Sequence, residues 1–129
     1  MLIAVVDDDE SVRRAMRRLL QAAGLEVEIY ASGTEFLEAL LHRRPSCVVV
    51  DLHMPGMSGL DIQSRLVDSG ADIPVIFMTA HDDRGARDRA LQAGAAGYLR
   101  KPFSEEVLLE AIHAAVPGAA GGCRNDSGV

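Results

Sequence analysis

The sequence predicts an α/β fold, a single doubly wound domain around a five-stranded parallel sheet. Two observations carry this prediction: apolar runs and helical patterns alternate five times along the chain, and 129 residues suffice for one domain. The composition, 48% hydrophobic and 25% charged, is that of a globular protein and excludes wholesale disorder. A net charge of -6 and an aromatic content of 4% argue against binding of nucleic acid or an anionic membrane by the domain itself.

Short apolar runs mark the strands. A run that is apolar throughout predicts a strand buried on both faces, whereas a mixed run predicts an edge strand. The apolar runs are Leu2–Val6, Cys47–Val50 and Ile73–Met78, and the mixed runs are Glu26–Tyr30 and Gly97–Arg100. With right-handed crossovers, two mixed strands at the edges predict the flavodoxin-like order 2-1-3-4-5.

Apolar residues at helical spacing, with capping residues at the ends, mark the helices. The predicted helices lie between Val12 and Ala23, Ser32 and Leu41, Ser58 and Ser69, Arg84 and Ala93, and Ser104 and Val116. Gly24 and Gly70 stop the first and the third, and Ser58 with Asp61 forms a capping box. The fourth is the poorest in large apolar residues. The fifth is predicted to bury Val107, Leu108, Ala111, Ile112 and Ala115.

The last residues differ in composition from the rest of the chain. Residues 117–129 are small and polar without periodicity, so we expect a flexible tail or the start of a linker after a domain that covers 1–116. Cys47 and Cys123 are predicted to be free thiols of a cytoplasmic protein. No apolar run approaches the ~20 residues that a membrane span needs, and no basic segment suggests a signal peptide.

Polar groups follow four of the five predicted strands. They are Asp7 to Glu10 after the first strand, Asp51 after the third, Thr79 after the fourth and Lys101, the only lysine, after the fifth. Because the carboxyl ends of parallel strands meet at one edge of the sheet, these groups should converge. Crowded carboxylates repel one another unless a cation is present, and an oxygen-only set favours Mg²⁺.

This set of groups fits phosphoryl transfer to a carboxylate. Asp51 would attack phosphorus, Asp7 and Asp8 would hold the metal, and Thr79 and Lys101 would each bind a phosphoryl oxygen. A nucleotide or flavin carrier fits less well, because four consecutive acids would repel a phosphate and the chain has no glycine-rich phosphate loop.

Four segments, spread over almost the whole chain up to about residue 116, carry a family resemblance. They are V-V-D-D-D-E at 5–10, V-V-V-D-L-H-M-P-G-M-S-G-L-D at 48–61, V-I-F-M-T-A-H at 75–81 and G-Y-L-R-K-P-F at 97–103. The chain resembles the receiver domain of two-component response regulators. The resemblance implies that Asp51 is a phosphoacceptor charged by a sensor histidine kinase. It also implies Asp8 as a direct Mg²⁺ ligand, Asp7 as a ligand through water and the main-chain carbonyl of His53 as a further ligand.

The same resemblance implies a switch. Thr79 would be the switch hydroxyl, Tyr98 would turn inward on phosphorylation, and the Lys101–Pro102 peptide would be cis. The weak helix 84–93 would be the element that moves. Such a domain is not an enzyme with a separate substrate but assists its own phosphorylation and dephosphorylation. The chain also resembles regulators with a LuxR-type helix-turn-helix output in its segments M-P-G-M-S-G and Y-L-R-K-P-F. This resemblance implies that DNA would be bound only through a C-terminal domain beyond this chain.

Several alternatives remain open at the level of sequence. His53 and His81 would flank the phosphoryl group and influence its lifetime, or be two exposed loop histidines, or hold zinc. The face formed by Arg13, Arg14, Arg17 and Arg18 is a solvated helix face or a kinase-docking surface. The helix 4–strand 5–helix 5 face would support a phosphorylation-dependent homodimer. The protein could also be a stand-alone receiver or phosphorelay protein, or an Asp-nucleophile phosphohydrolase, although His53 stands where such hydrolases carry a second Asp.

Overall fold

A computed structural model of the chain describes residues 1–80 and 84–116. The strands are β1 (Leu2–Val6), β2 (Glu26–Tyr30), β3 (Cys47–Asp51), β4 (Val75–Thr79) and β5 (Gly97–Arg100). The helices are α1 (Glu10–Ala22), α2 (Gly33–Ala39), α3 (Gly59–Asp68), α4 (Arg84–Gln92) and α5 (Glu105–Ala115). All strand pairs are parallel and the sheet order is β2-β1-β3-β4-β5, which confirms the predicted fold class and both edge strands.

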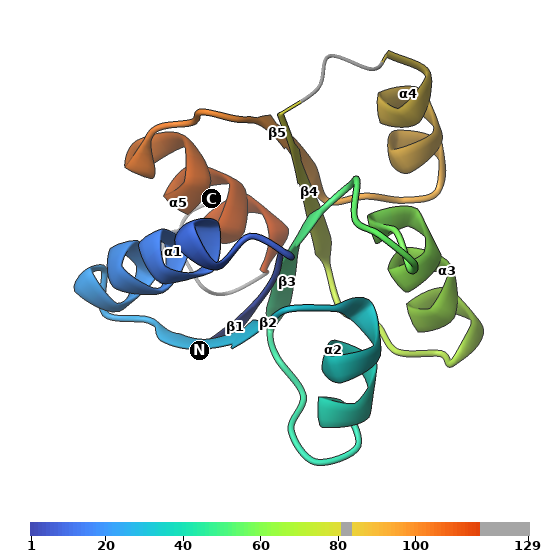
Figure 1. The fold of residues 1–129 in the computed structure, drawn as a ribbon, viewed down its shortest axis with the longest axis horizontal. Coiled ribbons are helices and arrows are strands. Elements are labelled where there is room, and N and C mark those ends of the chain that lie inside the picture. The colour runs from blue at the N-terminus through green and yellow to red at the C-terminus, as the bar shows by residue number, and fades with distance from the viewer. Residues whose placement is uncertain (81–83, 117–129) are drawn as a thin grey trace, which may run out of the picture.

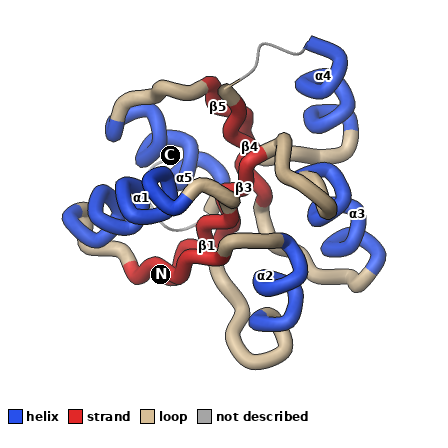
Figure 2. Tube along the Cα trace, in the orientation of Figure 1, coloured by secondary structure: helices blue, strands red, loops and turns tan. Residues whose placement is uncertain are grey.

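The sheet is the middle of three layers. Helices α1 and α5 cover one face, and α2, α3 and α4 cover the other (Figure 1). Figure 2 shows the strands in red at the centre, between these two groups of helices. Side chains alternate between the two faces of the sheet, so β1, β3 and β4 contribute side chains to the core on both faces. Each of these three strands is buried at every position, as their unbroken apolar runs predict.

Local signals fix the helix ends that lie near the sheet's carboxyl edge. The Asp9 carboxylate caps α1 by accepting from the backbone N–H groups of Ser11 and Val12, at 2.8 and 3.4 Å. Ser58 and Asp61 form the predicted reciprocal capping box at the start of α3. These caps satisfy N–H groups that have no partner within the helix, so both helices begin at a defined residue.

Three details of the sequence prediction are wrong. Helix α2 ends at Ala39 rather than Leu41, because beyond Leu40 the chain turns away from the core and leaves Leu41 82% exposed. Val107 is 45% exposed, so α5 is held on the sheet by Leu108 and Ile112 instead. Strand β4 runs from Val75 to Thr79 rather than from 73 to 78.

The β4 error has a simple origin. Pro74 has no N–H to donate to a ladder, so pairing with β3 starts at the next residue, where Val75 lies beside Val48. The ladder of β4 with β5 then extends one residue further than predicted and includes Thr79 beside Arg100.

The remaining expectations concern the cysteines, the membrane and the chain end. Cys47 is a free, fully buried thiol, and burial raises its pKa to about 12. Of the helices in the described part of the chain, none has the length and apolar content to cross a bilayer. His81, Cys123 and the predicted tail 117–129 lie outside the described residues.

Candidate functional site

Asp7, directly after β1, is the most completely fixed side chain at the carboxyl edge. It is 0% exposed. Its backbone N–H donates to the Tyr30 carbonyl at 3.1 Å, and Oδ1 accepts from the backbone N–H of Asp9 at 2.9 Å. Oδ2 accepts from Nζ of Lys101 at 2.9 Å, and the carbonyl accepts from the Arg13 guanidinium at 2.8 Å. All four polar atoms of this residue are therefore engaged, as a buried charged residue requires.

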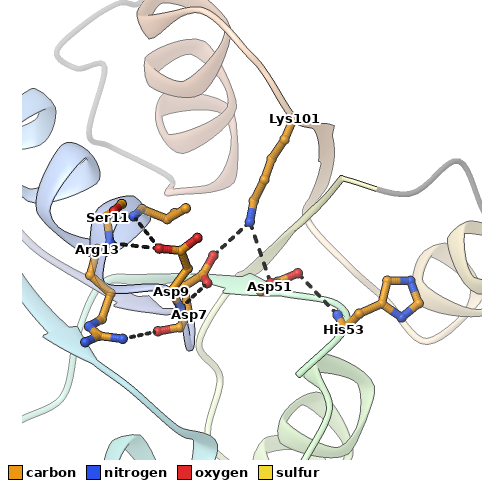
Figure 3. A network of polar contacts seen from close by, with 8 residues as sticks. Asp7, Asp9, Ser11, Arg13, Asp51, His53 and Lys101 are labelled. Carbon is orange, nitrogen blue, oxygen red and sulfur yellow. Dashed lines mark hydrogen bonds and ion pairs between the residues drawn. The ribbon is translucent and has the colours of Figure 1, made fainter. Parts of the chain in front are cut away.

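Lys101 joins the ends of β1 and β3. Its ammonium nitrogen lies 2.9 Å from Oδ2 of Asp7 and 3.6 Å from Oδ2 of Asp51 (Figure 3). The backbone N–H of Lys101 donates to the Thr79 carbonyl at 2.7 Å, which ties the loop after β5 to the end of β4. The Lys101–Pro102 peptide bond is cis, as the resemblance implies. One ammonium is thus held between two carboxylates that the sequence separates by 44 residues, as their numbers 7 and 51 show.

The charges at this edge do not balance. Burial raises the pKa of Asp51, the Lys101 ammonium lowers it less, and the neighbouring carboxylates Asp7 and Asp8 raise it further. For Lys101, burial lowers the pKa, but the hydrogen bond and charge of Asp7, with the charge of Asp51, outweigh burial and raise it. The site therefore holds more negative charge than its single ammonium neutralises.

The three carboxylates meet the basic requirements of a site for a hard divalent cation. Ligand oxygens of Asp7, Asp8 and Asp51 all lie within 4.8 Å of one another. Asp7 and Asp51 are buried and Asp8 is exposed, so the cluster is open on one side. Burial and the neighbouring acids raise the pKa of Asp51, so a cation would stabilise its charged form, and oxygen ligands suit Mg²⁺. Asp9 is used as the α1 cap and is not part of the cluster.

Thr79 and Tyr98 lie on the sheet face that α4 covers. Tyr98 on β5 is in register with Phe77 on β4, and side chains two residues apart on a strand share a face. Thr79 is 0% exposed, whereas Tyr98 is only partly buried and packs at the margin of the core that contains Ala86 and Ala90 of α4. The Arg87 guanidinium carbon lies 6.0 Å from the centre of the Tyr98 ring.

Gly59 allows the start of α3 to approach the end of β3. A Cβ at this position would lie 2.8 Å from the Asp51 carbonyl oxygen and 2.9 Å from the Phe77 ring. The Gly59 N–H donates to the Leu52 carbonyl at 3.2 Å, across the turn that follows Asp51. The second glycine of the M-P-G-M-S-G segment is therefore required by close packing behind Asp51.

Two residues make contacts at the site that the sequence did not predict. Arg13 was assigned to the α1 arginine face, yet it is partly buried and donates to the Asp7 carbonyl. The signal available was its position, six residues after Asp7 and one helical turn into α1. For His53, the backbone N–H donates to Oδ1 of Asp51 at 3.2 Å, which is a role that any non-proline residue could fill.

Comparison with known proteins identifies the family. Residues 3–113 match the sequence profile of the family described as "Response regulator receiver domain". The chain belongs to this family. Receiver domains are phosphoacceptors that work with sensor kinases, rather than enzymes with a separate substrate.

Individual relatives agree with this assignment. The receiver is 41% identical to Nodulation protein W of Bradyrhizobium diazoefficiens over 88% of this chain and 50% of that protein. It resembles the response regulator StyR, with 45% identity and a TM-score of 0.81 over 94% of this chain and 61% of that one. It also resembles FixJ-N, with 36% identity and a TM-score of 0.83 over 88% and 91% of the two chains. The chain spans about half the length of the curated relatives it matches.

We expect Gly59→Ala to destabilise the receiver by about 1–3 kcal/mol, since the added methyl meets the Asp51 carbonyl and the Phe77 ring. Gly97→Ala is the matched control, because a Cβ there meets its nearest neighbours at 3.5 Å, an ordinary contact. The free energy of unfolding in denaturant measures both. Equal effects of the two substitutions would show that close packing behind Asp51 does not require glycine.

Proposed function

We propose that Asp51 accepts a phosphoryl group from a phosphohistidine on a partner sensor kinase in the cytoplasm. The observation that supports this most directly is the position of Lys101, whose ammonium lies 3.6 Å from Oδ2 of Asp51. The ammonium is therefore placed to bind an oxygen of a phosphoryl group on Asp51. Burial, together with the charges of Asp7 and Asp8, also raises the pKa of Asp51 despite the Lys101 ammonium, so added positive charge would stabilise its ionised form.

The reaction needs little covalent chemistry from the receiver. An Asp51 oxygen attacks phosphorus, the P–O bond forms as the P–N bond breaks, and the electron pair leaves on the imidazole nitrogen, which is protonated from solvent. The Lys101 ammonium and the Thr79 hydroxyl each bind one phosphoryl oxygen. Attack of water on the same phosphorus later releases phosphate and restores the carboxylate. The receiver thus assists both its own phosphorylation and its own dephosphorylation.

The metal site that we propose consists of Asp8 as direct ligand, Asp7 through water, Asp51 and the main-chain carbonyl of His53. The oxygen-only donor set and the surplus of negative charge support Mg²⁺. When bound, Mg²⁺ supplies positive charge to the phosphoryl oxygens. Without a cation the carboxylates of Asp7, Asp8 and Asp51 repel one another, and a bound cation would lower this repulsion.

Phosphorylation would be transmitted through Thr79 and Tyr98 to α4. The phosphoryl group adds roughly -1.5 to -2 charges, which attract the Thr79 hydroxyl and the Lys101 ammonium. Movement of Thr79 leaves room for Tyr98 on the same sheet face. Helix α4 buries only Ala86 and Ala90 among its residues, so a coupling of about 1–3 kcal/mol suffices to shift it.

The output lies outside this chain in our proposal. We take 1–116 as the receiver domain and 117–129 as a tail or linker. The curated relatives are about twice as long, which leaves room for a C-terminal output domain, and we propose a transcriptional one of the LuxR type. The α4–β5–α5 face would then control the output and support a phosphorylation-dependent homodimer. A stand-alone receiver or phosphorelay protein is the alternative, and the length of the natural reading frame decides between them.

The first prediction from this proposal concerns the acceptor itself. Incubation with acetyl phosphate and MgCl₂ should add one phosphoryl group to the chain, measured by intact mass, and the adduct should disappear in alkali as acyl phosphates do. Asp51→Asn should abolish it and EDTA should suppress it, whereas Asp68→Asn on the exposed end of α3 should react like the wild type. An adduct that persists in Asp51→Asn, or sustained turnover of a soluble phosphoester as in a hydrolase, would contradict the proposal.

Lys101→Arg should impair switching while sparing the fold. A compact ammonium fits between two carboxylates and can move to one phosphoryl oxygen, whereas a planar guanidinium prefers to bind one carboxylate with two hydrogen bonds. With Tyr30→Phe as background, Tyr98 is the only tyrosine and its fluorescence reports the switch. The change that acetyl phosphate induces should be lost in Lys101→Arg and kept in Arg14→Lys. A normal fluorescence change in Lys101→Arg would contradict the role of the ammonium.

His53 and His81 are proposed to influence the lifetime of the phosphoryl group. The backbone N–H of His53 donates to Oδ1 of Asp51, while its imidazole points away from the acceptor (Figure 3). If the ring turned toward the phosphoryl group, a charged imidazole could pair with it. We expect the acyl-phosphate lifetime to change in His53→Asn and in His81→Asn, with His113→Asn on α5 as control. Unchanged lifetimes in the first two variants would contradict this role of the two histidines.

A further inference from the structure

Arg13 differs from the other arginines of α1. Arg14, Arg17 and Arg18 are exposed, and Arg14 pairs with Glu10 at 3.0 Å on the helix surface. Arg13 is partly buried, and its guanidinium donates to the main-chain carbonyl of Asp7 at 2.8 Å. Figure 3 shows this side chain turned back from α1 toward the end of β1. A charge-assisted hydrogen bond of this length is among the stronger polar contacts in proteins.

The bond to Arg13 fixes one particular peptide unit. The Asp7 carbonyl belongs to the peptide that joins Asp7 to Asp8. The other atoms of Asp7 are held by the Tyr30 carbonyl, the Asp9 N–H and Lys101. Asp8 is exposed, so the direction of its carboxylate follows the backbone that carries it. The orientation of this peptide unit therefore decides how Asp8 faces Asp7 and Asp51.

We propose that Arg13 is a positioning residue of the cation site: its guanidinium holds the Asp7–Asp8 peptide so that the Asp8 carboxylate faces the other two. This inference rests on the proposed function, because it assigns Arg13 to the Mg²⁺ site proposed there. It also separates the α1 arginines into one that supports the site and three that lie on the helix surface.

Charge and positioning make opposite predictions for the loss of Arg13. As a nearby cation, Arg13 repels Mg²⁺, so its removal alone would strengthen binding. An exposed or partly exposed charge contributes at most about 1 kcal/mol, or about fivefold. Loss of a group that orients a metal ligand typically weakens binding by about 10–100-fold. The positioning effect is the larger, so the net result should be weaker binding.

The test is calorimetric titration of the 129-residue chain with MgCl₂ alone, without phosphoryl donor. Arg13→Gln should bind Mg²⁺ about tenfold more weakly than the wild type. Arg17→Gln removes the same charge from the same helix and should bind as tightly as the wild type or slightly more tightly. Arg13→Lys keeps a donor and should bind more tightly than Arg13→Gln. Unfolding in EDTA, measured for each variant, shows that the chain is folded.

Several results would overturn the inference. Equal Mg²⁺ affinity in Arg13→Gln and the wild type would do so, even if Arg13→Gln lowered stability in EDTA, because Arg13 would then be structural only. Equal weakening in Arg13→Gln and Arg17→Gln would also overturn it, since position would not matter. If Arg13→Gln does not fold, Arg13→Lys replaces it: a lysine keeps a donor but lacks the planar guanidinium, so it should still bind Mg²⁺ more weakly than the wild type, and equal affinity would overturn the inference. Absence of Mg²⁺ binding by the wild type would instead overturn the proposed metal site together with this inference.

Discussion

The architecture of the site follows from two buried carboxylates that share one ammonium. Asp7 is 0% and Asp51 9% exposed, and among the described residues Lys101 is the cation that pairs with both carboxylates. Burying one carboxylate is tolerable when every polar atom is engaged, as it is for Asp7. Burying a second beside the first is tolerable only with a cation at hand. Lys101 supplies part of that charge, but burial and the neighbouring acids still raise the pKa of Asp51 above its ordinary value. A site with this deficit is receptive to a divalent cation and, with the same ammonium, to a phosphoryl group.

The sheet is what enforces this crowding. Asp7, Asp51 and Thr79 stand at the ends of three adjacent parallel strands, and the register fixes Asp51 beside Met78, one residue before Thr79. Strands buried on both faces cannot shift without exposing the core, so Asp7 and Asp51 cannot move apart to relieve the repulsion between their carboxylates. Helix α4, in contrast to these strands, is held by few core contacts, because its buried residues are the small Ala86 and Ala90. The fold thus combines a rigid edge, where charge is concentrated, with a lightly anchored helix next to it.

The sequence predicted the fold and the convergence of the acids because both depend on periodicity and on where parallel strands end. Continuous and mixed apolar runs identified the inner and edge strands, and the sheet order then placed Asp7, Asp8, Asp51 and Lys101 together. The failures have a different origin. Leu41 and Val107 are apolar residues at plausible helical positions, and only the packing of the folded chain leaves them exposed. Arg13 belongs to a run of similar arginines, and nothing in its residue type reveals that its guanidinium turns back to a backbone carbonyl.

The shared ammonium is tested most directly by a carboxyl-carbon NMR titration of Asp51 in the Mg²⁺-free receiver, with and without Lys101→Met. Burial and the neighbouring acids outweigh Lys101 in the folded chain, so the carboxyl of Asp51 should titrate with a pKa above its ordinary value. Because the ammonium lowers that pKa, Lys101→Met should raise it further. In both proteins the folded state should lose stability as the pH rises and the Asp51 carboxyl gives up its proton. A pKa of Asp51 at or below the ordinary aspartate value, or one that does not respond to the loss of Lys101, would contradict the account.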